Sequence, residues 1–175
     1  VMMPPRRDLG HPAWLHAQGV NAVSINLEVS DELRARQIAP AKARLGRRHT
    51  LDCIERAVEA FGVGRVQSLV VLGAAIEPLE STLRGVQDLV DRGCVPVLSA
   101  FRPHRLTPLA RAPSAAFDEV VTAYERTLEI CERTGTGVRP GPRCVACHHN
   151  TVTVPDDSDF YLHADDDVAA GWTRC

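Results

Sequence analysis

The stretch VQSLVVLGAAIEPLESTLRGVQDLVDRGCVPVLSAF, residues 66–101, determines the fold that the sequence predicts. It opens with a nearly continuous apolar run, Val66–Leu72, which is typical of a strand buried on both faces. Apolar residues then recur at positions 79, 83, 86, 89 and 90, the spacing of an amphipathic helix that ends at Gly93. A second apolar run covers residues 94–101. Strand, helix and strand in this order predict a parallel βαβ unit.

The same alternation continues on both sides of this unit. Before it, the sequence predicts an apolar stub at residues 1–3, a short helix over 8–18 and a strand over 20–29. A basic loop over 44–50 then leads into a helix over 51–61, with Thr50 as its N-cap and Gly62 after its end. After the unit, a long helix is expected from Ser114 to Glu132, followed by Gly135.

Three strands and a stub define the expected fold class, α/β with a partial parallel (β/α) barrel and an irregular C-terminal extension. A closed eight-stranded barrel needs about 200 or more residues, so 175 residues are too few for a whole one. We expect the partial barrel over residues 1–137, a Cys/His-containing loop extension over 138–155 and an acidic tail over 156–175. Loops that follow parallel strands gather at one edge of the sheet, where such folds place their chemistry.

The amino-acid composition argues against some classes of protein. Hydrophobic residues make up 45% and charged residues 24% of the chain, which is typical of a globular protein. No apolar run approaches the roughly 18 residues that span a membrane. Lys42 is the only lysine among 20 cations. We attribute this excess of arginine to coding bias rather than to nucleic-acid binding. Without a secretory signal, we expect a cytoplasmic protein whose six cysteines are buried, metal-binding or catalytic.

Polar residues follow each predicted strand. Asn26 and Glu28 end the first strand on one face, where they could hold a diol, or else face solvent and nearby arginines. Gly73 follows the second strand and permits close approach of a planar ligand, or makes a simple turn. Arg102 follows the third strand, where it could anchor a carboxylate or phosphate, or be one more surface arginine.

A second cluster lies near the C-terminus. Cys144 and Cys147 have the C-x₂-C spacing of a soft-metal chelate, and His148 or His149 could supply a third ligand. No second C-x₂-C pair accompanies it, so ordinary loop thiols remain the alternative.

Taken in order, three segments resemble the second half of radical S-adenosylmethionine enzymes, and most closely the biotin-synthase-like subgroup. The segments are residues 19–28 (GVNAVSINLE), Leu72-Gly73 with Glu77, and residues 95–103 (VPVLSAFRP) with 107–109 (TPL). The resemblance covers roughly residues 1–153. It implies a partial (β/α)₆ barrel that holds a [4Fe–4S] cluster and S-adenosylmethionine, and a 5′-deoxyadenosyl radical that abstracts hydrogen from a small-molecule substrate.

The resemblance also implies roles for individual residues. Asn26 and Glu28 match the positions that bind the ribose hydroxyls of the cofactor. Arg36 and Lys42 fall where the family often has a basic group for the methionine carboxylate. Leu72 and Gly73 match the strand end that borders the adenine, and Arg102 lies on the substrate side.

The sequence departs from the family in one respect. The family binds its cluster through a C-x₃-C-x₂-C triplet near the N-terminus, and no cysteine here precedes Cys53. We therefore expect a C-terminal portion of such an enzyme, inactive alone, whose partner is the missing N-terminal half of the barrel.

Two other readings remain open. One is a non-enzymatic zinc or iron–sulfur module centred on Cys144, Cys147 and His148. The other is an aldolase-type barrel, which would usually carry a Schiff-base lysine on a strand, whereas Lys42 is expected in a loop.

Overall fold

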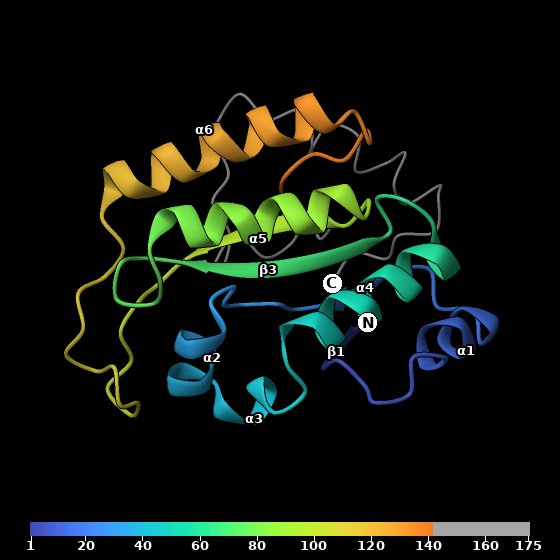
Figure 1. Ribbon diagram of the computed structural model, residues 1–175, viewed down its shortest axis with the longest axis horizontal. Helices are drawn as coiled ribbons and strands as arrows, with labels where there is room; N and C mark the ends of the chain where they lie inside the picture. The colour runs from blue at the N-terminus through green and yellow to red at the C-terminus, as the bar shows by residue number, and fades with distance from the viewer. Residues whose placement is uncertain (142–175) are drawn as a thin grey trace.

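A computed structural model of the chain describes residues 1–141 and shows a parallel four-stranded sheet covered by helices (Figure 1). The strands lie in the order β1-β2-β3-β4, which is also their order along the chain. Their bounds are Met2–Met3 for β1, Val23–Ile25 for β2, Val66–Leu72 for β3 and Val95–Ala100 for β4. The predicted α/β class and parallel pairing are confirmed. Within residues 1–141 the sheet is open, with β1 and β4 at its edges, so a barrel remains a prediction.

Six helices connect and cover these strands in the described part of the chain. They are α1 (His11–Ala17), α2 (Glu32–Ile38), α3 (Pro40–Ala43), α4 (Arg47–Phe61), α5 (Leu79–Asp91) and α6 (Phe117–Thr134). Helix α4 packs against β2 and β3, and α5 packs against β3, β4 and α6. Figure 1 shows α5 running along β3, with α6 stacked beyond it. None of these helices is long and apolar enough to cross a membrane.

Strand β3 organises the core. It pairs with β4 over six residue pairs, from Gln67↔Val95 to Leu72↔Ala100. Its residues alternate between buried positions, such as Val70, and half-buried ones, such as Leu69. The expectation that β3 is buried on both faces is therefore wrong, because the described helices cover only one face completely. Val70 belongs to a core cluster with Ile54, and Leu72 belongs to a second cluster beneath α5 and α6.

The start of α4 differs from the prediction. The helix begins at Arg47, directly after Gly46. The φ of 81° at Gly46 interrupts the helical conformation between α3 and α4. The predicted basic loop over 44–50 therefore ends at Gly46. Thr50 is not the N-cap, because it lies within the first turns and its hydroxyl donates a hydrogen bond to the Gly46 carbonyl at 3.1 Å. The helix ends as predicted at Phe61, before Gly62.

A matched pair of leucines tests this packing. Leu89 on α5 is fully buried, whereas Leu33 on α2 is 69% exposed. We expect Leu89→Ala to lower the free energy of unfolding by about 2–5 kcal/mol, because it removes apolar contacts and leaves a cavity. Leu33→Ala should change it by no more than about 0.5 kcal/mol. Urea titration followed by circular dichroism measures both; similar losses for the two variants would contradict the packing described here.

Candidate functional site: a pocket beside a broken strand ladder

The regular pairing of β2 with β3 stops after Ser24, and side chains then take over. The Asn26 Oδ1 accepts a hydrogen bond from the Leu69 N–H at 3.2 Å. The Leu27 N–H donates to the hydroxyl of Ser68 at 2.9 Å. Backbone pairing resumes at Glu28, whose N–H donates to the Leu69 carbonyl at 2.8 Å. Breaks of this kind bend a strand and redirect its side chains, and they are common beside active sites.

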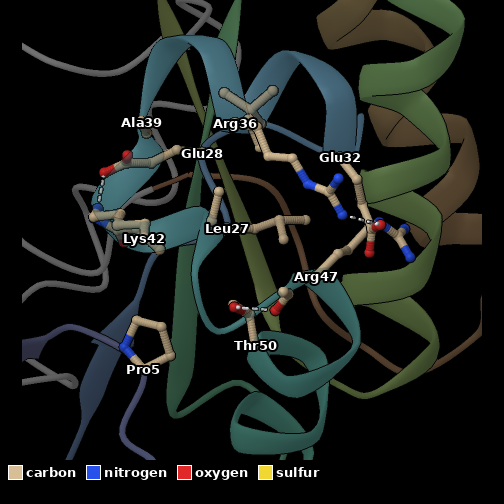
Figure 2. A pocket seen from close by; sticks show the side chains of 14 residues that line it. Pro5, Leu27, Glu28, Glu32, Arg36, Ala39, Lys42, Arg47 and Thr50 are labelled. Atoms are coloured by element: carbon tan, nitrogen blue, oxygen red, sulfur yellow. Dashed lines mark hydrogen bonds and ion pairs between the residues drawn. The ribbon is translucent and has the colours of Figure 1, made fainter.

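Glu28 has a strained backbone. Its φ of 62° is the only positive φ at a non-glycine residue among residues 1–141. A side chain in this left-handed region costs roughly 1–2 kcal/mol and persists where the surroundings impose it. The carboxylate of Glu28 forms an ion pair with the ammonium group of Lys42, on α3 (Figure 2). Lys42 was expected in a loop and lies on this short helix instead, so it is not on a strand, where an aldolase-type enzyme would usually carry its lysine.

Asn26, Glu28, Arg36 and Lys42 line one shallow pocket that opens to solvent and has about 40 Å³ of accessible space. The pocket lies between the residues that follow β2, helices α2 and α3, and the start of α4. Figure 2 shows Glu28 and Lys42 pointing toward one another at one side, and Arg36 at the other. The side chain of Leu27 lies between the two sides.

The charges that line this pocket are weakly constrained. The Lys42 side chain is 40% exposed and that of Glu28 is 27% exposed. Arg36 faces Glu32 at 4.0 Å, and both side chains are more than half exposed. Partly exposed pairs contribute about 0–1 kcal/mol to stability, so a ligand could replace either pair at small cost. The pocket therefore offers an acceptor for hydroxyl groups and, at each of its two sides, one cation that could pair with a carboxylate.

Arg47 is held more firmly at the same side as Arg36. Its guanidinium forms an ion pair with Asp88 on α5, and its Nε lies 3.3 Å from the Ser30 hydroxyl. Arg47 thus links α4 to α5 and to the segment that follows β2. No motif in the sequence indicates this role of Arg47.

Three other predicted site residues do not line this pocket. Leu72 is 1% exposed and packs in the core cluster beneath α5 and α6. Gly73 has a φ of 139°, and a Cβ placed on it would lie 3.3 Å from Phe101 and 3.4 Å from Ala115. Arg102 is exposed in the loop that follows β4. Their cofactor and substrate roles remain predictions.

Metal-ligating groups give no site among the described residues. Cys144, Cys147 and His148 lie outside residues 1–141, so the metal site predicted there remains a prediction. Within residues 1–141, no three His, Cys, Asp or Glu residues are arranged to hold a metal ion. Cys53, Cys94 and Cys131 are separate, buried free thiols. The described residues therefore do not fit an iron–sulfur cluster.

Glu77 has a structural role that no spacing or motif in the sequence indicates. It follows β3, it is fully buried, and its carboxylate accepts hydrogen bonds from the backbone N–H groups of Ser30 at 2.8 Å and Asp31 at 2.7 Å. Glu77 was part of the quoted resemblance, but without an assigned contact. An acidic residue in the short segment between an apolar strand and the following helix was the available signal.

Comparison with known proteins gives one distant similarity. No family model matches the sequence. The chain is 28% identical over 116 residues to a bacteriochlorophyllide c C-7(1)-hydroxylase of Chlorobaculum limnaeum. The aligned region is 65% of this chain and 28% of the relative, so the chain spans little more than a quarter of the relative's length.

The buried thiols give a testable reactivity. Burial raises the pKa of Cys131 to about 11, with a further contribution from Glu132, and burial also raises the pKa values of Cys53 and Cys94. Because the thiolate is the reactive form, we expect Cys131 at pH 8 to be alkylated about 100-fold more slowly in the native protein than in denaturant. The rate should rise with pH up to the raised pKa. Iodoacetamide labelling with residue-resolved mass spectrometry measures this, and equal native and denatured rates would contradict it.

Proposed function

We propose that the chain is the cofactor-binding part of a radical S-adenosylmethionine enzyme and that the pocket beside Glu28 binds S-adenosylmethionine. One observation carries the proposal: the four residues that the family resemblance assigns to ribose and methionine contacts, Asn26, Glu28, Arg36 and Lys42, line a single pocket. The distant similarity to a hydroxylase supports it, since hydroxylation of carbon requires a C–H bond to be broken.

The residues of the pocket suit the two polar ends of this cofactor. The Glu28 carboxylate would accept hydrogen bonds from the ribose hydroxyls, and the Asn26 Nδ2 would add a donor. The ammonium group of Lys42 would pair with the methionine carboxylate, and the guanidinium of Arg36, at the opposite side of the pocket, is the alternative cation for that group. Without a ligand, Glu28 and Lys42 neutralise one another. Binding would exchange this ion pair for two contacts with the cofactor.

The cluster must come from elsewhere in this proposal. In the family, a [4Fe–4S] cluster supplies the electron that cleaves S-adenosylmethionine. The cysteines of this chain stand at positions 53, 94, 131, 144, 147 and 175, and none of these spacings is C-x₃-C-x₂-C. The proposal therefore includes a further part of the barrel that carries the cluster. The edge strand β1, with Met2 72% exposed, is where further strands would pair.

The proposed substrate is a small molecule bound near the same edge of the sheet. Arg102, in the exposed loop after β4, would face the substrate rather than the cofactor. The name of the relative makes a chlorophyll-type tetrapyrrole one candidate.

Binding of two ligands tests the proposed pocket. S-Adenosylhomocysteine carries both the ribose and the amino-acid end, whereas 5′-methylthioadenosine lacks the amino-acid end. We expect Glu28→Gln to weaken both ligands about 10- to 100-fold, because each loses a hydrogen bond to a charged group. Lys42→Met should weaken S-adenosylhomocysteine alone. Isothermal titration calorimetry measures all four combinations.

Glu55→Gln provides the matched control for this experiment. Glu55 is an exposed acid on α4 that does not line the pocket, so both affinities should stay at the wild-type value. The proposal fails if the wild-type chain binds neither ligand, or if Glu28→Gln binds both as tightly as wild type.

A further inference from the structure

A fully buried carboxylate joins two elements that are distant in sequence. Glu77 lies between β3 and α5 and has no exposed surface. Its Oε1 accepts the N–H of Ser30 at 2.8 Å, and its Oε2 accepts the N–H of Asp31 at 2.7 Å. These partners are 47 and 46 residues away along the chain. A buried charge is tolerated only when it is paired or well hydrogen-bonded, so both bonds are needed together.

The segment that Glu77 holds connects the parts of the pocket. Residues 28–31 begin at Glu28, which lines the pocket, and end at Asp31, the N-cap of α2. The Asp31 side chain accepts the N–H of Arg34 at 2.9 Å, which starts the helix that carries Arg36. Displacing Asp31 would therefore move Arg36 as well as Glu28.

A second contact holds the same segment from α5. A Cβ placed on Gly85 would lie 2.7 Å from the hydroxyl oxygen of Ser30 and 2.8 Å from its Cβ. A Cβ atom essentially never lies within 3.0 Å of another non-bonded heavy atom, so any residue larger than glycine at position 85 would displace Ser30. Arg47 reaches the same Ser30 hydroxyl while pairing with Asp88 on α5. The segment is thus fixed by Glu77 and by the surface of α5.

We propose that Glu77 is a positioning residue: its carboxylate, with Gly85 behind Ser30, sets the placement of Glu28 and Arg36 in the binding pocket. This inference rests on the proposed function for what the pocket binds. It adds that the affinity depends on a residue that does not line the pocket.

Glu77→Gln tests the hydrogen bonds directly. A glutamine keeps one acceptor but presents an NH₂ group to the other backbone N–H. We expect the amides of residues 28–36 to exchange hydrogen at least about tenfold faster, because local opening becomes easier. Residues 66–72 of β3 should keep their wild-type exchange. Exchange followed by mass spectrometry needs no ligand, so it tests the positioning even if the pocket binds something else.

Glu80→Gln is the matched control. Glu80 lies three residues further along, is exposed, and pairs with Arg126 on α6 at 2.5 Å. It undergoes the same chemical change without touching residues 28–31. Its exchange pattern over residues 28–36 should remain that of the wild type, and so should its affinity for S-adenosylhomocysteine.

Affinity provides the second measurement. At a temperature well below the unfolding transition of each variant, Glu77→Gln should raise the dissociation constant for S-adenosylhomocysteine at least about tenfold. Gly85→Ala should do the same, because its new methyl group pushes Ser30 aside. Adding Ser30→Gly to Gly85→Ala removes both clashing atoms and should restore the affinity to within about threefold of the Ser30→Gly single variant.

The outcomes separate the two proposals. If the wild-type chain does not bind the ligand, the proposed function fails, while faster exchange of residues 28–36 in Glu77→Gln still supports the positioning role. If the ligand binds but Glu77→Gln changes neither exchange nor affinity, the positioning role is overturned and the proposed function stands. Equal loss of affinity in Glu77→Gln and Glu80→Gln would also overturn it, and so would failure of Ser30→Gly to rescue Gly85→Ala.

Discussion

The break in the β2–β3 ladder imposes the constraint on which the pocket depends, because four backbone N–H groups lose or lack a carbonyl partner there. They belong to Leu27, Leu69, Ser30 and Asp31, and each finds a side-chain acceptor instead. The acceptors are Ser68, Asn26 and the two oxygens of Glu77. A buried N–H without a partner costs about 1–3 kcal/mol. By accepting these hydrogen bonds, the side chains stabilise an irregular backbone conformation after β2 that differs from regular strand pairing. This backbone conformation places Glu28 at the pocket.

Asn26 combines two roles that the sequence did not separate. Strand alternation predicted that Asn26 and Glu28 share a face, and both do line the same pocket. The Oδ1 of Asn26, however, accepts hydrogen bonds from the Ser24 hydroxyl and the Leu69 N–H. Its Nδ2 donates to the Met2 sulfur at 3.9 Å, a weak contact that a ligand acceptor could replace. Asn26 therefore has a structural role in the contact between β2 and β3, and a substitution there would disturb this strand pairing as well as the pocket.

The elements with strong hydrophobic periodicity were predictable from the sequence. The bounds of β3 and the start of α5 agree with the prediction, and α6 differs by three residues at its start. Strand β2 is shorter than its apolar sequence suggested, because its pairing is interrupted by side chains of β3 and of its own loop. Helix α2 was not predicted, since it has no buried residue and its Leu33 is 69% exposed. A helix without an apolar face has no periodic signal, although Asp31 was available as an N-cap.

Only the residues of the site that belong to a recognisable sequence motif were predictable. The resemblance identified four residues of the pocket, but Leu72, Gly73 and Arg102 lie outside its lining. Glu77 and Glu80 illustrate the reason. Both follow β3 within eight residues and carry the same carboxylate, yet one is fully buried and the other is exposed. The difference comes from Ser30 and Asp31, whose N–H groups approach Glu77 only after the chain has folded. Such a contact has no spacing rule along the sequence, so the residue that orders the pocket is recognised from the structure.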